Sequence, residues 1–148
     1  MKMKLAIGND QHGLVYKQMI METFPLNEYV DVGTFDTEPV SYPGIAEKVA
    51  ELVARGECER GILICGTGIG MAMTANKIKG AYAAVCHDIY SAQRMILSND
   101  GNILCMGALV IGIKTAEEIV RQWLPLRFDP NNASAAKVAH LRQIEAKN

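Results

Sequence analysis

The chain has 148 residues, of which 49% are hydrophobic, and its 15 basic and 16 acidic residues leave a net charge of -1. This length and apolar content predict one domain over residues 1–148 with a substantial core. The mixed charges exclude a basic face for nucleic acid and an acidic tail. The first apolar run ends at Asp10 and is too short for a signal sequence or a membrane span. We therefore expect a cytoplasmic protein whose partners are small molecules or other protein chains.

Short apolar runs alternate along the chain with longer stretches of helical periodicity. We predict strands at residues 4–9, 28–33, 61–65, 81–86 and 102–107, and helices at residues 14–24, 42–55, 69–77, 88–97, 115–124 and 134–146. This alternation is typical of an α/β fold whose parallel sheet is covered by helices on both faces. We expect a doubly wound five-stranded sheet in the order 2-1-3-4-5, with right-handed crossovers.

Ligands of a doubly wound sheet bind beyond the carboxyl ends of the strands, where the winding direction reverses, here between the first and third strands. The turns that follow four of the strands read "NDQHG", "CGTGIG", "HDIYSA" and "GAL". They hold a large share of the chemically versatile side chains, all expected at one edge of the sheet: Asp10, Gln11, His12, Cys65, Thr67, His87 and Asp88. Polar residues gather in loops of any function, so this pattern predicts where a site lies and not what it does.

The four cysteines, Cys58, Cys65, Cys86 and Cys105, form neither a C-x-x-C metal motif nor a dense disulfide framework. This usage predicts reduced thiols, in agreement with a cytoplasmic location. Cys86 and Cys105 lie in or beside apolar runs, where a cysteine is usually a small buried hydrophobic residue. Cys65 differs because Gly66, Gly68 and Gly70 follow it.

The glycines after Cys65 allow backbone N–H groups to converge on one point, because no Cβ atom is in the way. A helix that begins near Ile69 adds its positive end, so the turn predicts an anion-binding loop that favours a thiolate at Cys65. Three chemistries use these parts: acyl transfer through a cysteine intermediate, binding of a phosphate or nucleotide, and proton abstraction next to a carbonyl group. The glycine spacing does not choose among them.

Two other families are disfavoured by the same turn. "GTGIGM" lacks the last glycine of a dinucleotide-binding fingerprint and follows the third strand instead of the first. A phosphoacceptor receiver domain needs an aspartate where Cys65 stands.

The stretch "ICGTGIGMAMTANKIKG" at residues 64–80, with "GNDQHG", "SYPGIAEKVAELV", "YSAQ" and "GALVIG", resembles the ribose-5-phosphate isomerase type B and galactose-6-phosphate isomerase family over about residues 3–123. The resemblance implies a homodimer or homotetramer with active sites shared between subunits, and a last helix that packs on a partner subunit. It also implies an aldose-ketose isomerase that acts through a cis-enediolate with no metal and no cofactor.

The resemblance also implies a role for each matching residue. Cys65 would be the base that moves the proton between two carbons, and Thr67 would assist it by moving the hydroxyl proton or by fixing the sugar. The expected substrate-binding residues are Asp10, Gln11, His12, Tyr42, Gly66, Gly68, Ile69, Gly70, Asn99 and Lys137, with the amides of residues 66–70 on the enediolate oxygen and Asn99 from the neighbouring subunit.

The sequence departs from the family pattern at three places. Gln11 stands where the family commonly has a histidine, Ser98 stands where the ring-opening histidine is expected, and "PNNASAAK" lacks the arginines that hold the phosphate. One explanation is a short open-chain substrate such as a tetrose phosphate, with the phosphate held by Lys137, Arg142 or Lys17. Another is that His12 or His87 replaces the missing histidine, and a third is an unphosphorylated or carboxylated sugar.

These observations predict an isomerase of a small sugar phosphate, either of the ribose 5-phosphate/ribulose 5-phosphate type or shorter. The alternative is a catalytically silent subunit or sensor that binds a sugar phosphate. A cysteine acyl transferase is a more distant candidate.

Overall fold

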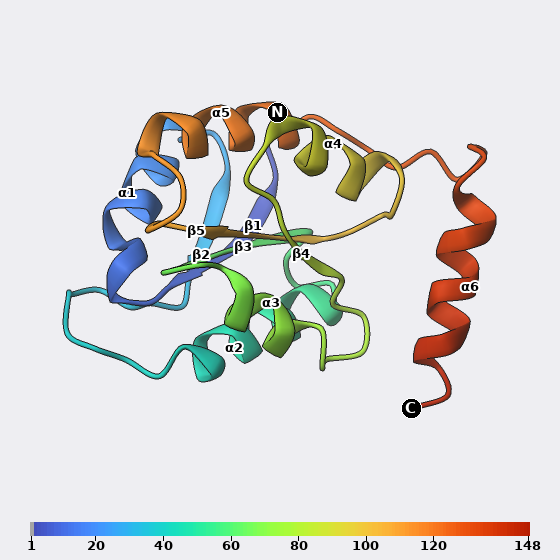
Figure 1. Cartoon of the computed structure of the whole chain (residues 1–148), viewed down its shortest axis with the longest axis horizontal. Coiled ribbons are helices and arrows are strands. Elements are labelled where there is room, and N and C mark those ends of the chain that lie inside the picture. The colour runs from blue at the N-terminus through green and yellow to red at the C-terminus, as the bar shows by residue number, and fades with distance from the viewer. Residues whose placement is uncertain (1) are drawn as a thin grey trace.

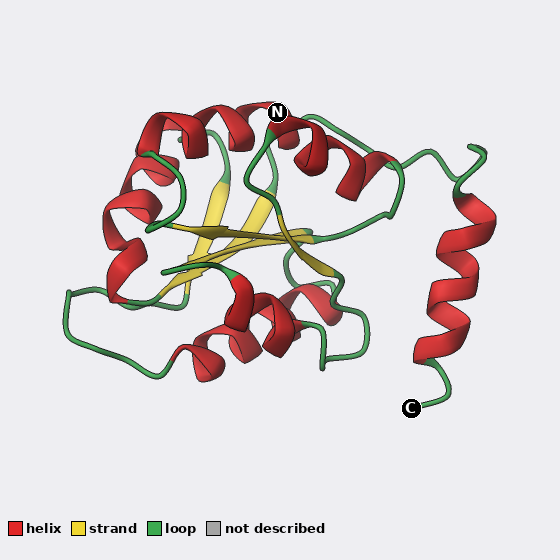
Figure 2. Cartoon of the chain, in the orientation of Figure 1, coloured by secondary structure: helices red, strands yellow, loops and turns green. Residues whose placement is uncertain are grey.

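The structure is a computed structural model that describes residues 2–148, so Met1, the first residue of the expected domain, lies outside the described residues. Figures 1 and 2 show a layer of strands between two layers of helices. In chain order the elements are β1 (Lys4–Asn9), the 3-10 turn η1 (Gln11–Gly13), α1 (Leu14–Thr23), β2 (Glu28–Asp31), α2 (Tyr42–Ala54), β3 (Arg60–Cys65), α3 (Ile69–Ala75), β4 (Ala83–Val85), α4 (Ile89–Leu97), β5 (Ile103–Gly107), α5 (Ile113–Trp123) and α6 (Ala135–Glu145).

The five strands are all parallel, as predicted, but their order is β2-β1-β3-β5-β4, so the expected order 2-1-3-4-5 is wrong in its last two places. All five residues of β5 are buried, and β5 pairs with β3 through Gly61 and Ile103, among others. β4 has three half-buried residues and pairs on one side only. The fully buried strand β5 therefore takes an interior position next to β3, and the short strand β4 takes the edge.

The two faces of the sheet carry different helices. α1, α4 and α5 cover one face, and α2 and α3 cover the other, as Figure 1 shows above and below the strands. The connections β1 to β2 and β4 to β5 run in one direction along the sheet and use the first face, whereas β2 to β3 and β3 to β4 run in the opposite direction and use the second. All four crossovers thus have the same hand, as the rule for parallel strands requires.

The strand residues alternate between the two cores because successive side chains of a strand point to opposite faces. Leu5 and Ile7 of β1 join the core under α1, α4 and α5, whereas Ala6 joins the core under α2 and α3. In the same way Ile64 and Cys65 of β3 belong to opposite cores. Cys65 therefore projects to the side of the sheet that α2 and α3 cover.

The last helix, α6, stands at one end of the molecule, beside the sheet rather than on it (Figure 1). It contacts its own chain through an ion pair between Arg142 and Asp100 at 2.6 Å and a hydrogen bond of 2.9 Å from the Tyr82 hydroxyl to Glu145. That α6 packs on a partner subunit stays a prediction. Among residues 2–148, no helix has both the length and the apolar character needed to cross a membrane.

Candidate active site

The carboxyl ends of β1 and β3 lie side by side, as expected for the point where the winding reverses. Asn9 is paired with Ile64 in the parallel register, and the Asp10 N–H donates to the Ile64 carbonyl at 3.1 Å. Gly13 packs so closely that a Cβ atom there would lie 2.6 Å from the Ile64 carbonyl oxygen. The turn after β1 is therefore held against the last residues of β3. We call this end of the sheet the carboxyl edge.

Cys65 is the last residue of β3 and begins the segment 65–70, which we call the Cys65 loop. Its side chain is 5% exposed, and the Gly68 N–H donates to the Cys65 Sγ at 3.0 Å. This bond depends on a positive φ of 79° at Gly68, the residue that precedes α3. The loop thus folds back on its own cysteine and aims an amide at the sulfur, as the glycine pattern predicts. α3 ends at Ala75, two residues earlier than expected.

The turn after β5 supports the Cys65 loop from the neighbouring strand. The Ala108 N–H donates to the Cys65 carbonyl at 2.8 Å, and the Leu109 N–H donates to the Gly66 carbonyl at 3.0 Å. Gly107 lies against Thr67, because a Cβ atom at Gly107 would be 2.7 Å from the Thr67 Cα. These contacts hold the Cys65 and Gly66 carbonyl groups and so fix the loop against β5.

Thr67 and Tyr42 also lie at the Cys65 loop. The Thr67 Oγ1 accepts a hydrogen bond of 3.2 Å from the Ile69 N–H, so the hydroxyl caps the first turn of α3. Tyr42, the first residue of α2, lies on Gly70, because a Cβ atom there would overlap the hydroxyl end of its ring. Tyr42 is 38% exposed, so part of its side chain faces solvent at the edge of the site.

Asp10 and His12 form a pair beside the Cys65 loop. Asp10 is 7% exposed, its Oδ1 accepts from the His12 N–H at 2.9 Å, and its Oδ2 lies 3.2 Å from the His12 Nδ1. A Cβ atom on Gly66 would lie 3.7 Å from the same ring nitrogen. Gln11 points elsewhere, since its Oε1 accepts from the Val40 N–H at 3.2 Å and so holds the segment between β2 and α2.

His87 and Asp88 have structural partners. The His87 Nε2 accepts from the Gly107 N–H at 2.8 Å, which requires that this nitrogen is unprotonated. Asp88 caps α4 by accepting from the Ser91 N–H and hydroxyl at 2.7 and 2.8 Å. These hydrogen bonds from Ser91 lower the pKa of the Asp88 carboxyl. Both residues stabilise the carboxyl edge.

All four cysteines are free and buried. Burial raises the pKa of the Cys86 thiol to about 11, and the nearby Asp88 carboxylate adds to the shift. Burial also raises the pKa of Cys105. These two thiols therefore stay protonated at neutral pH and act as core side chains, as their apolar context predicts. Within residues 2–148, no three His, Cys, Asp or Glu side chains are grouped as metal ligands.

Asn99 and Lys137 are the two expected site residues that the chain does not bring to the Cys65 loop. α4 starts at the carboxyl edge and ends before β5 begins, so Asn99 lies at the opposite edge of the sheet. There Asn99 and Lys137 line a pocket of about 360 Å3 with Ser98 and Ser134. Figure 1 shows α6 at the right and the loops after β1, β3 and β5 toward the left.

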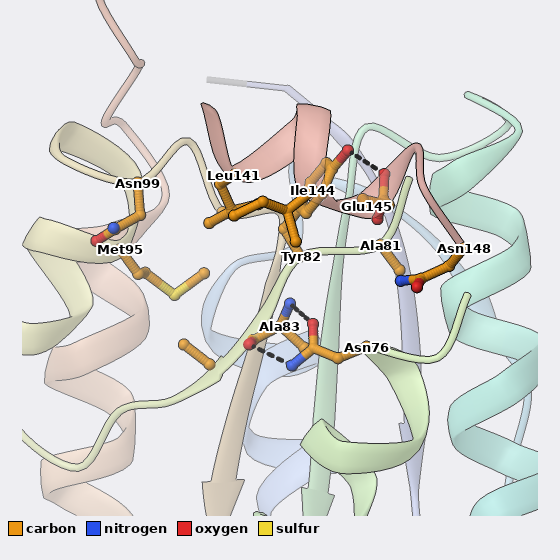
Figure 3. Close-up of a pocket in the computed structure, with 12 residues that line it drawn as sticks. Asn76, Ala81, Tyr82, Ala83, Met95, Asn99, Leu141, Ile144, Glu145 and Asn148 are labelled. Carbon is orange, nitrogen blue, oxygen red and sulfur yellow. Dashed lines mark hydrogen bonds between the residues drawn. The ribbon is translucent and has the colours of Figure 1, made fainter. Parts of the chain in front are cut away.

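A second cavity, of about 470 Å3, lies between α6 and β4. Figure 3 shows Asn99 at one side of this cavity, Leu141 and Ile144 of α6 at another, and the hydrogen bond between Tyr82 and Glu145. Its lining is mostly apolar and includes no residue of the Cys65 loop. The candidate site is therefore the Cys65 loop with the turn after β1, and not this cavity.

Two of the three expected phosphate ligands are already engaged in other contacts. Lys17 is 2% exposed and donates to Asp31 at 3.0 Å and to the Thr34 carbonyl at 2.6 Å. Arg142 pairs with Asp100 at the far end of the molecule. Neither side chain can turn to the Cys65 loop of its own chain without breaking these contacts, so Lys137 is the remaining candidate.

Two residues, one beside the Cys65 loop and one at the opposite edge of the sheet, carry no signal in the sequence. Leu109 lies over Gly66, with its Cδ1 3.3 Å from the position of a Cβ atom there. Arg94 donates from Nε to the Ser98 hydroxyl at 2.7 Å, at the position where the ring-opening histidine is expected. Only the four-residue spacing on a predicted helix could indicate the second contact, and that spacing is common.

Comparison with known proteins gives concordant relatives. Residues 5–141 match the model of a family described as Ribose/Galactose Isomerase. The chain is 49% identical over 148 residues to the Ribose-5-P isomerase B of Listeria innocua, covering 99% of each chain. It is 47% identical over 143 residues to the D-erythrulose-4-phosphate isomerase 2 of Mycolicibacterium smegmatis, covering 93% of this chain and 94% of that protein. The solved structure of Clostridium thermocellum Ribose-5-Phosphate Isomerase B superposes with a TM-score of 0.93 at 42% identity, covering 98% of this chain and 99% of that chain.

Proposed function

Since this chain belongs to the ribose/galactose isomerase family, we propose that it is a sugar-phosphate isomerase in which Cys65 moves a proton between neighbouring carbons of an open-chain sugar. The observation that carries the proposal is the hydrogen bond from the Gly68 N–H to the buried Cys65 Sγ at 3.0 Å. An amide that faces the sulfur stabilises a thiolate, and a thiolate is the form that can abstract a proton.

In the direction from aldose to ketose, the Cys65 thiolate removes the hydrogen of C2 as a proton. The electrons of that bond form the C1–C2 double bond, and the carbonyl electrons move onto O1. The amides of the Cys65 loop hydrogen-bond the resulting enediolate oxygen. After a proton has moved from O2 to O1, the thiol returns its proton to C1 and O2 becomes the carbonyl oxygen. The reaction needs no external oxidant or reductant, so the proposal includes no cofactor.

Other residues at the carboxyl edge would bind the sugar. Asp10 would accept hydrogen bonds from its hydroxyl groups, and Tyr42 would limit the pocket over Gly70. Thr67 would fix the loop, because its Oγ1 already accepts from the Ile69 N–H. His12 stands next to Gly66, within the same group of residues.

The substrate we favour is a four-carbon sugar phosphate. A tetrose phosphate with its phosphate on O4 cannot close a furanose ring through that oxygen, so it needs no group for ring opening. Two features support this choice. Ser98 stands where the ring-opening histidine is expected, and its hydroxyl accepts a hydrogen bond from Arg94 at 2.7 Å. In addition, one close relative is named for D-erythrulose 4-phosphate. The five-carbon ribose 5-phosphate, named in another relative, is the competing substrate.

We also propose that the site is completed by a second copy of the chain. The pocket with Ser98, Asn99, Ser134 and Lys137 holds a cation and polar groups suited to a phosphate, but it lies at the opposite edge of the sheet from Cys65. A second copy can bring such a pocket to the Cys65 loop. Large apolar side chains exposed around the carboxyl edge support a covered surface: Phe35, Ile69, Tyr90, Leu109 and Val110 are each more than half exposed.

The test is NMR spectroscopy in deuterated water with four-, five- and six-carbon aldose and ketose phosphates and their unphosphorylated counterparts. We expect interconversion with deuterium at the carbon next to the carbonyl group, fastest for the four-carbon pair. Cys65→Ala should abolish both, whereas Cys58→Ala, which changes another buried free thiol, should retain them.

Each other outcome would change the proposal. Turnover of ribose 5-phosphate with none of the four-carbon pair would reject the substrate but keep the isomerase. Binding without turnover across the panel would favour the catalytically silent subunit.

A further inference from the structure

Aldose-ketose isomerisation moves two protons, one between carbons and one between oxygens, and Cys65 accounts only for the first. The second needs a group that can both give and take a proton near neutral pH, which is the range of an imidazole. Thr67 is less suited because an aliphatic hydroxyl, unlike an imidazole, does not change its charge near neutral pH. The question is therefore which histidine stands by the Cys65 loop with a free ring nitrogen.

The structure separates the three histidines. His87 uses its Nε2 to accept from the Gly107 N–H at 2.8 Å, and His140 lies on α6 at the other end of the molecule. His12 has its Nδ1 3.2 Å from the Asp10 Oδ2. Because a carboxylate only accepts, the proton of a neutral His12 resides on Nδ1, and Nε2 is left with a free lone pair.

Two further contacts fix the position of His12. Its backbone N–H donates to the Asp10 Oδ1 at 2.9 Å, so both carboxylate oxygens of one buried residue hold this histidine. The ring lies against Gly66, the residue directly after Cys65. The His12 side chain is 39% exposed, so the ring is accessible to a ligand from solvent.

We propose that His12, oriented by Asp10, is the catalytic acid-base group that moves the proton between the two oxygens of the substrate. The inference rests on the proposed function. Starting from the aldose, the His12 imidazolium gives the Nε2 proton to O1 after Cys65 has taken the proton from C2. Neutral His12 then takes the proton from the O2 hydroxyl, and in a separate, later step the Cys65 thiol protonates C1. His12 ends as imidazolium and Cys65 as thiolate, so the atoms and charges balance.

Among the described residues, two titratable ones lie beside the ring: Asp10 on the same turn, and Cys65, which directly precedes Gly66 at the end of β3. The turn after β5 places the apolar side chain of Leu109 over Gly66. Asp10 fixes the orientation of the ring, because its carboxylate contacts both the backbone N–H and the Nδ1 of His12. It is a positioning residue here, since it acts through His12.

The experiment separates the two proton transfers with His12→Gln. Starting from the ketose in deuterated water, exchange at the carbon next to the carbonyl group needs only Cys65, whereas aldose formation needs both groups. We expect His12→Gln to retain deuterium exchange into the unreacted ketose while its kcat for isomerisation falls about 100-fold with a much smaller change in KM. The change in kcat between about pH 5 and 8, where imidazole titrates, should disappear. His140→Gln is the matched control and should behave as the unaltered protein.

Other results would overturn the inference. If His12→Gln isomerises within about threefold of the unaltered protein with the same pH profile, another group moves the oxygen-bound proton. If exchange and isomerisation fall together while folding is retained, His12 serves binding or the cysteine step. If the unaltered protein shows neither exchange nor isomerisation, the proposed function itself fails, and this inference fails with it.

Discussion

At the scale of single residues, the Cys65 loop depends on a backbone conformation that a side chain would disturb. Gly68 has a φ of 79°, and a Cβ atom there would lie 3.0 to 3.1 Å from backbone atoms of Met106 in β5. Backbone cannot move aside as the end of a flexible side chain can. The amide that donates to the Cys65 Sγ is therefore positioned by a glycine that also lets the Cys65 loop approach β5.

Gly68→Ala should weaken both the fold and the activity. The strained φ and the contact with Met106 should lower the free energy of unfolding by about 1–3 kcal/mol. Movement of the Gly68 amide away from the Cys65 Sγ should reduce kcat. Denaturant unfolding and isomerase assays measure the two effects, with Gly112→Ala as control because its φ is -70° and no atom lies within 4 Å of the added Cβ. Equal stability and activity in the two variants would contradict this account.

At the scale of elements, α2 packs directly on β1 and β3 because both strands have a glycine beneath it. A Cβ atom on Gly61 would lie 2.7 Å from the Val49 Cγ1, and one on Gly8 would lie 2.6 Å from the Ile45 Cγ2. This close packing determines how far α2 stands from the sheet. It therefore also determines where Tyr42, at the start of α2, meets the Cys65 loop.

Gly61→Ala and Val49→Ala should each lower the free energy of unfolding. The double variant should lower it by less than the sum of the two single losses. The added methyl group overpacks the interface and the removed ones leave a cavity, each at about 1–3 kcal/mol. In the double variant the added methyl group fills the space that the removed methyl groups leave. We therefore expect a favourable coupling of about 1 kcal/mol in denaturant unfolding. Gly44→Ala, on α2 with nothing near the added Cβ, is the control and should not destabilise. Additive costs would show that α2 is not held at this contact.

At the scale of the whole molecule, two groups of candidate residues lie at opposite ends. Cys65, Asp10 and Tyr42 lie at the carboxyl edge, whereas Asn99 and Lys137 lie beside α6. The contacts of α6 with Asp100 and Tyr82 hold the second group where it is. If both groups serve one substrate, they must come from different copies of the chain, and the molecule that acts is an oligomer.

A mixture of two inactive variants tests the shared site. Cys65→Ala and Lys137→Ala, refolded together, should recover about a quarter of the full activity, because half of the dimers are mixed and each mixed dimer has one intact site. Mixing Cys65→Ala with Asp10→Asn is the control and should recover nothing, since both changes lie at the same edge. If neither mixture recovers activity although mass spectrometry detects mixed dimers, Cys65 and Lys137 do not contribute to one shared site.

Much of the site could be predicted because it depends on local chemistry. The glycines after Cys65 predict a loop whose amides converge, and the Gly68 N–H does point at the sulfur. The contact between Asp10 and His12 could not be predicted, because neighbouring residues of a turn can point in several directions. Likewise, nothing in the sequence indicated that Gln11 would turn away to Val40.

The sequence by itself determined the α/β class, the parallel strands and the edge where Asp10 and Cys65 meet. The reason is that apolar runs buried on both faces must be parallel strands covered by helices, whose carboxyl ends share one edge. Only the tertiary structure decided the order of β4 and β5, because both strands are apolar and which of them pairs with β3 depends on contacts between remote segments. Only the tertiary structure separated Lys137 from Cys65, since distances between remote segments depend on how the whole chain packs.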